Sequence, residues 1–180
     1  AQIPGAFYSG PTPRGWIVPP GAYQVKLSVG GKTIVQPLTV KADPRDPPGA
    51  EAAIDAKTQL AIAVYHDIDA VHRAVNDIRK TRAELTRVKT GAKASKELVS
   101  TADSLDGRLK PIEETLMQVN MKGSEANLAF PGMLNEQYAS FQGAIDDADT
   151  PPTAPELAMY DDLHRRLEVQ LAAWRAASGT

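Results

Sequence analysis

The stretch IDAKTQLAIAVYHDIDAVHRAVNDIRKTRAEL, residues 54–85, decides the fold class of this 180-residue chain. Its apolar side chains recur at alternating spacings of three and four residues, with Lys57 and Arg82 in the two remaining seam positions. The apolar members are Ile54, Ala61, Val64, Ile68, Val71, Val75, Ile78 and Leu85. This spacing forms one stripe along an α-helix. It predicts a helix over about 50–88 that packs at a shallow angle against other helices.

The same spacing continues in three later segments, which predict helices over about 94–120, 132–146 and 154–178. Thr153 and Glu156 have the spacing of a capping box at the start of the last helix. Pro111 lies inside the second segment without shifting its apolar stripe, so we expect a kink with room provided by Gly107. Together these segments predict a mainly α protein, an antiparallel bundle of about four helices.

The first part of the chain is different, because it is rich in glycine and proline and contains β-like stretches. Apolar and polar side chains alternate over residues 23–29, and Gly30-Gly31 suits a tight hairpin turn. The return strand is expected over about 33–41. Its apolar parity shifts across Pro37, which predicts a bulge or an edge position there. Residues 16–18 are a candidate third strand.

The composition changes at the proline-rich stretch ADPRDPPGA, residues 42–50. We therefore divide the chain into residues 1–48, a partial β-sandwich segment, and residues 49–180, the helical bundle. An immunoglobulin-like sandwich needs about seven strands, and an isolated hairpin is marginal in water. The hairpin must pack on the helices, pair with another chain, or belong to a larger β-domain. We favour the last alternative, with some packing on the helices.

Composition and motifs exclude several classes of function. The chain has no cysteine, which rules out disulfides and thiolate metal sites, and its net charge of −2 argues against general nucleic-acid binding. It has no nucleophile elbow, no phosphate-binding glycine loop and no apolar run long enough to cross a bilayer. We interpret His66, His72 and His164 as surface or flanking residues. We expect no catalytic residue, cofactor or metal.

Two weak sets of ligand-contacting candidates remain. Trp16 and Tyr23 are aromatic residues that can stack on a sugar, although such residues more often anchor an irregular segment to a core. Arg82, Arg87 and Lys89 belong to a basic region, residues 79–96, between the first two expected helices. That region can bind a polyanion or a membrane surface, but cations near a helix C-terminus are also placed favourably there without a ligand.

A family resemblance accompanies these patterns. The stretch PPGAYQVKLSVGGKTIVQPLTVKADPR, residues 19–45, with the long alanine-rich helix that follows, resembles the C-terminal region of bacterial exported proteins with sortilin-like, Asp-box (BNR) repeat β-propellers, often labelled glycosyl hydrolases. The resemblance is carried by Pro20, Gly21, Tyr23, Val25, Leu27, Asp43-Pro44-Arg45, Ala148-Asp149, Pro152-Thr153 and Trp174. The Asp-box repeats themselves are absent from these residues.

We expect a non-catalytic structural or interaction module, because the packing signals are coherent and no polar cluster converges. The resemblance implies that the module belongs to a larger exported protein, secreted or periplasmic. Its expected partner is the upstream propeller domain, and the missing strands of the sheet are expected to lie upstream. A second copy of the chain is another candidate partner, because an open sheet edge invites pairing. The alternatives are a carbohydrate-binding accessory module through the aromatic residues, and a polyanion or membrane-surface adaptor through the basic region.

Overall fold

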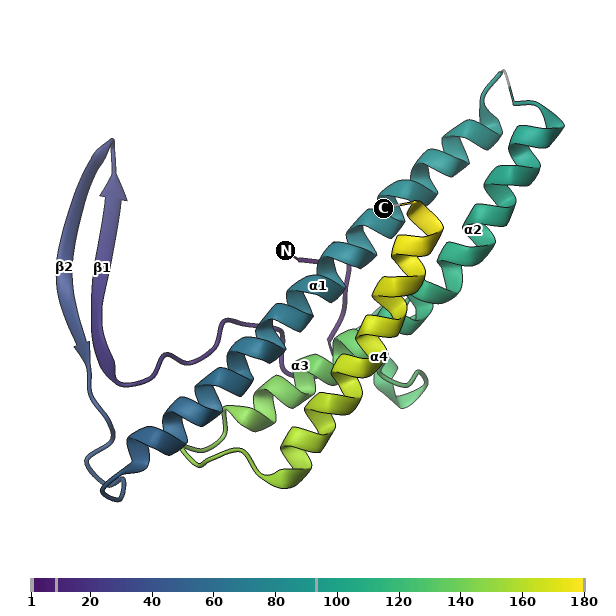
Figure 1. Cartoon of the computed structure of the whole chain (residues 1–180). Helices are drawn as coiled ribbons and strands as arrows, with labels where there is room; N and C mark the ends of the chain where they lie inside the picture. The colour runs from purple at the N-terminus through teal and green to yellow at the C-terminus, as the bar shows by residue number, and fades with distance from the viewer. Residues whose placement is uncertain (1, 9, 93, 180) are drawn as a thin grey trace.

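The computed structural model describes residues 2–8, 10–92 and 94–179, and it confirms a mainly α fold with a small β segment (Figure 1). The elements in chain order are β1 (Gly21–Val29), β2 (Lys32–Val40), α1 (Ala50–Thr90), α2 (Lys96–Leu116), the short 3₁₀ helix η1 (Ser124–Leu128), α3 (Leu134–Ile145) and α4 (Ala154–Ser178). All four predicted helices form, and their ends agree with the expected ranges to within a few residues.

Helix α1 is the rod against which the other helices pack (Figure 1). Helix α2 runs back along its C-terminal half, where Arg79 on α1 pairs with Glu113 on α2. Helix α3 lies along the N-terminal half, where the Tyr138 hydroxyl donates to Asp67. Helix α4 contacts all three of the others. Two shorter helices placed end to end thus cover one long helix.

The apolar stripe of α1 forms the centre of the core, as its spacing predicts. Val64, Val71, Val75 and Ile78 are fully buried. They pack with Leu109 and Leu116 of α2, Leu134 and Tyr138 of α3, and Leu163 and Leu167 of α4. Burying each such side chain contributes roughly 1.5–3 kcal/mol, so the stripe is the main source of the bundle's stability.

The helix ends follow the expected local chemistry in part. The Thr153 hydroxyl accepts from the backbone N–H of Glu156, whose carboxylate accepts from the Thr153 N–H at 2.7 Å, so the capping box is confirmed. Helix α2 continues through Pro111 to Leu116. A Cβ added at Gly107 meets nothing within 4 Å, so no other described segment packs closely on the helix there; the expected kink stays a prediction.

The described residues before the hairpin pack on the helices. The side chain of Ile3 is buried in the core. The carbonyls of Gln2 and Pro4 accept from side chains of α1. Gln142 of α3 bonds both the N–H and the carbonyl of Arg14, at 3.1 and 2.7 Å. This segment, which composition groups with the hairpin, therefore lies along the bundle.

The hairpin stands apart from the helices (Figure 1). Its register is continuous from Gly21 opposite Val40 to Val29 opposite Lys32, so of the two alternatives expected at Pro37 the bulge is excluded and the edge position is confirmed. In a two-stranded sheet both strands are edges, and an edge accommodates the proline without a bulge. Residues 16–18 form no strand, and among the described residues neither strand contacts a helix. The predicted packing of the hairpin on the helices is therefore wrong.

Candidate functional site

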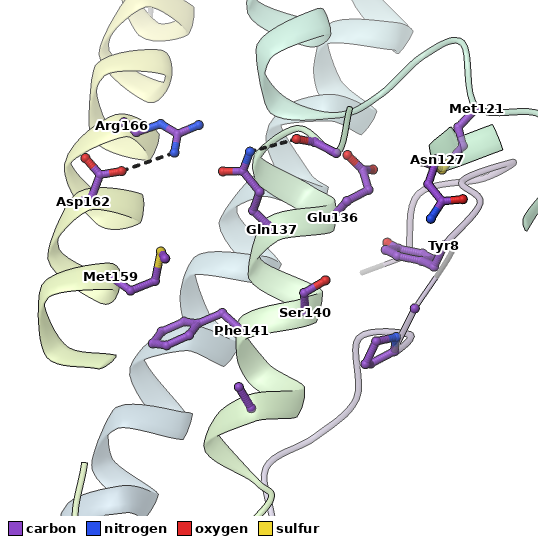
Figure 2. Close-up of a pocket in the computed structure, with 14 residues that line it drawn as sticks. Tyr8, Met121, Asn127, Glu136, Gln137, Ser140, Phe141, Met159, Asp162 and Arg166 are labelled. Carbon is purple, nitrogen blue, oxygen red and sulfur yellow. Dashed lines mark hydrogen bonds and ion pairs between the residues drawn. The ribbon is translucent and has the colours of Figure 1, made fainter. Parts of the chain in front are cut away.

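A cavity of about 710 Å³ lies over α3, and Figure 2 shows the side chains around it. Residues of the N-terminal segment, the loop after α2 and the first half of α4 line it together with α3. Its volume falls within the range of small-molecule pockets, about 300–1,000 Å³. The lining residues are Tyr8, Gly10, Pro11, Met121, Asn127, Gly132, Glu136, Gln137, Ser140, Phe141, Ala144, Met159, Asp162 and Arg166.

The charged groups at this cavity hold one another or the backbone. Arg166 pairs with Asp162 one turn earlier on α4, at 3.2 Å. The Glu136 carboxylate accepts from the backbone N–H of Met133 at 2.8 Å and of Gln118 at 3.2 Å, and from the Asn135 amide at 2.9 Å. Glu136 thus fixes the start of α3 and the end of the α2 segment.

A buried polar network adjoins the cavity. Asn135 lies at its centre, with its side-chain oxygen 3.0 Å from His72 Nε2 and its amide 3.0 Å from the Tyr8 hydroxyl. Burial raises the pKa of Tyr8, although the bond to Asn135 opposes the shift. His72 is 5 % exposed, so its placement as a surface residue is wrong. The network ties the N-terminal segment to α1 and α3.

A second polar cluster joins three helices around Asp67. The Tyr138 hydroxyl donates to Asp67 Oδ2 at 2.9 Å, and His164 Nδ1 lies 2.8 Å from the same oxygen. The Tyr160 ring stacks on His164 with centroids 5.5 Å apart. A histidine oriented by an aspartate is two thirds of a catalytic triad. Through these bonds the cluster connects α1, α3 and α4; among the described residues no hydroxyl group bonds to His164.

The predicted basic candidates are paired with carboxylates. Arg82 bonds Asp106 at 2.7 Å and Glu113 at 2.5 Å, and it lowers the pKa of Asp106. Lys89 pairs with Asp103 of α2 at 3.0 Å. Arg87 pairs with Glu84 on its own helix. Carboxylates of α2 thus pair with Arg79, Arg82 and Lys89 of the basic region, and Arg87 is paired within α1. Lys93 of this region lies outside the described residues.

The predicted aromatic candidates do not share a site. Trp16 packs edge to face on Tyr65 of α1, with centroids 5.0 Å apart. Tyr23 lies at the base of the hairpin, where its hydroxyl donates to the Pro19 carbonyl at 2.7 Å. Each ring has a local structural role, and the half-buried Trp16 offers little free face for a sugar.

The exposed apolar face of the hairpin is the most unusual surface of the molecule. Val25, Leu27, Ile34 and Leu38 point to the same side of the sheet and are 52, 59, 59 and 47 % exposed. Val29 extends this face toward the turn and is 67 % exposed. A contiguous apolar face of this kind marks an interaction surface. The alternation in the sequence predicted a buried face, whereas the structure leaves it uncovered.

Neither a family model nor a curated protein nor a solved structure matches the chain. Among the residues described, no helix is long and apolar enough to cross a membrane. The same residues contain no cluster of three or more histidine, aspartate or glutamate side chains arranged to hold a metal ion.

Proposed function

We propose that this chain is a non-catalytic interaction module of a larger exported protein. Its helical bundle is a rigid base, and its hairpin is the docking element, whose apolar face packs against an adjoining β-domain. The observation that carries the proposal is the exposure of Val25, Leu27, Ile34 and Leu38 on a hairpin that touches no helix within the described residues. A two-stranded sheet with an uncovered apolar face is marginal in water, and a second layer of structure stabilises it.

The chemistry of the polar clusters supports a non-catalytic role. Glu136 and Asp67 are both occupied by neighbours that connect secondary-structure elements. We expect that removing either carboxylate lowers the stability of the bundle. The resemblance of residues 19–45 to the segment that follows a β-propeller supports an exported parent protein, with that propeller as the adjoining domain.

Two alternatives lose support from specific contacts. A carbohydrate-binding role through Trp16 is disfavoured because that ring already packs on Tyr65. A polyanion-binding or membrane-surface role through Arg82, Arg87 and Lys89 is disfavoured because carboxylates neutralise all three. Glycan-array binding that disappears in Trp16→Ala, or heparin retention with a steep salt dependence, would revive the respective alternative.

The test compares Leu27→Asp in the isolated chain and in the longer natural polypeptide. In the isolated chain the thermal midpoint of the bundle should remain unchanged, because Leu27 contacts no helix. In the longer polypeptide the charge would lie in an apolar interface. The free energy of unfolding of the adjoining domain should therefore fall by about 2–4 kcal/mol, and its unfolding temperature should fall with it.

Val75→Ala is the matched control, because Val75 is fully buried in the bundle. It should destabilise the bundle in both contexts, by about 2–3 kcal/mol. A longer polypeptide that contains no further β-domain, or one that tolerates Leu27→Asp as well as the isolated chain does, would refute the proposed function.

A further inference from the structure

The turn of the hairpin determines which backbone groups face outward. Gly30 and Gly31 both have positive φ, 56° and 76°, as a two-residue type I′ turn requires. Val29 and Lys32 flank this turn and form a hydrogen-bonded pair. Along an antiparallel ladder, hydrogen-bonded pairs alternate with pairs whose N–H and C=O groups point away from the partner strand. The outward-facing residues are Ala22, Gln24, Lys26 and Ser28 on β1, and Thr33, Val35, Pro37 and Thr39 on β2. The Ser28 and Thr33 hydroxyls lie 2.9 Å apart, in keeping with the close side chains of such a pair.

The two free edges of the sheet are therefore not equivalent. Pro37 lies opposite Gln24, in the middle of the outer edge of β2, and it has no N–H to donate. A strand added to β2 would lose a ladder hydrogen bond at this point and would meet the proline ring. The outer edge of β1 retains an N–H and a C=O at each of Gln24, Lys26 and Ser28. Only β1 offers an uninterrupted edge.

Charge restricts the strand that can occupy this edge. Between Gly21 and Val40 the only charged side chains are Lys26 and Lys32, and there is no carboxylate. Lys26 lies at the middle of the free edge of β1, where a lysine discourages pairing with a strand that lacks an opposite charge. A second copy of the hairpin would add two more lysines and no carboxylate. The charge pattern thus favours a different, acidic strand.

We propose that a β-strand of the adjoining domain adds to the free edge of β1 and places an aspartate or glutamate opposite Lys26. The proposal rests on the proposed function and specifies how the hairpin docks. On the other face the added strand carries apolar residues beside Val25 and Leu27, and it extends the sheet by β-augmentation. Lys26 contributes specificity, because strands without the carboxylate leave its charge unpaired.

Residue-resolved hydrogen exchange in the longer natural polypeptide tests the proposal. The outward amides of Gln24, Lys26 and Ser28 exchange freely in the isolated chain and should become protected by at least about 100-fold in the longer polypeptide. The outward amides of Thr33 and Val35 should exchange at the same rate in both. The β2 amides serve as an internal control for the β1 amides, since both strands belong to one hairpin.

Matched proline variants extend the test to the edge itself. Gln24→Pro removes an outward N–H of β1 and leaves the pairing with β2 intact, so it should abolish the protection at Lys26 and Ser28. Val35→Pro makes the equivalent change on β2 and should have no effect on it. Lys26→Glu should reduce the protection by about tenfold, whereas Lys32→Glu, an equal change of charge beside the turn, should not.

The outcomes separate the two proposals. Protection of the β2 amides instead of the β1 amides, or burial of Leu27 without protection at either edge, would refute strand addition to β1 and leave the docking function standing. Protection at β1 could also require a second copy of the chain, which sedimentation would show as a concentration-dependent dimer. That result would refute the acidic strand and would identify self-pairing at the β1 edge. An unprotected hairpin with an exposed Leu27 would refute both proposals.

Discussion

Glu113 shows how a single buried carboxylate organises the contact between two helices. It is 4 % exposed and accepts from Arg79 at 2.7 Å and from Arg82 at 2.5 Å. Its sequence neighbour Glu114 is partly exposed and lies 3.8 Å from Lys110. Two adjacent glutamates on one helix thus have different roles, because they point about 100° apart.

We predict that Glu113→Gln lowers the free energy of unfolding by about 2–3 kcal/mol, since it leaves the partly buried Arg79 guanidinium without a carboxylate and Arg82 with Asp106 alone. Glu114→Gln should change it by less than about 0.5 kcal/mol. Urea denaturation monitored by circular dichroism measures both. Equal effects of the two variants would contradict the role assigned to Glu113.

Tyr138 provides a second test at the scale of one residue, and it concerns high pH. Burial raises the pKa of Tyr138, and the neighbouring Asp67 carboxylate raises it further. A phenol whose pKa is higher in the folded protein stabilises the fold below the ordinary tyrosine pKa of about 10, and this contribution is lost as the pH rises above it. We therefore expect the bundle to lose stability above about pH 10.

Tyr138→Phe should remove this part of the alkaline sensitivity and should cost about 1–2 kcal/mol at neutral pH, because Asp67 loses a donor. Thermal unfolding measured from about pH 8 to about pH 11 reports both effects. Tyr23→Phe, in the hairpin, should leave the unfolding of the bundle unchanged. An unaltered pH dependence in Tyr138→Phe would show that its ionisation is not linked to unfolding.

The start of helix α4 carries a prediction at the scale of an element. The backbone N–H and then the hydroxyl of Thr153 lower the pKa of Glu156. Glu156 therefore stabilises the helix start above the ordinary glutamate pKa of about 4.3, and this contribution is lost as the pH falls through its lower value in the folded protein.

Thr153→Ala should destabilise the protein by about 1 kcal/mol at neutral pH, with a smaller difference from the wild type below about pH 4. Thr150→Ala, in the exposed loop before α4, is the control and should be close to neutral. Thermal unfolding from neutral to acid pH measures the two differences. A difference that stays constant over this range would exclude a contribution from the Glu156 charge.

The elements were largely predictable, because their signals are local. The spacing of Ile54 to Leu85 and the capping pair Thr153 and Glu156 depend on residues a few positions apart, so the sequence alone places the helices. Of the two alternatives predicted at Pro37, the edge position is confirmed and the bulge is excluded, for a physical reason. Pro37 lies on an edge strand, where its missing N–H would face outward, so no ladder hydrogen bond to β1 is lost and the strand is not distorted. The shift in apolar parity across Pro37 therefore causes no change of register.

The polar clusters were not predictable in the same way. Asp67 lies three residues after Val64 and four before Val71, which is the seam spacing, and this was the available signal that its side chain faces other helices. Its partners Tyr138 and His164 come from distant segments that only the tertiary fold brings together. His72 was misplaced because α3 and the N-terminal segment, neither of which its own helix reveals, cover it.

At the scale of the whole molecule, the structure consists of a well-packed helical bundle and a hairpin that shares none of its core. The alternation of apolar and polar side chains predicted the strands. It did not predict that the hairpin stands apart from the helices, because the sequence of a strand does not say which surface covers it. The apolar face of the hairpin is better explained by a docking role than by the stability of this chain alone. The molecule thus combines a packed bundle with an exposed apolar hairpin, the surface that the proposed docking role would use.

Thiol labelling of Leu27→Cys tests this account most directly, because the chain has no cysteine of its own. In the isolated chain the thiol should react at nearly the rate of a free thiol, and in the longer polypeptide that we propose at least about 100-fold more slowly. Val169→Cys, exposed on α4, should react rapidly in both. Equal rapid labelling of residue 27 in the two contexts would contradict the docking role of the hairpin.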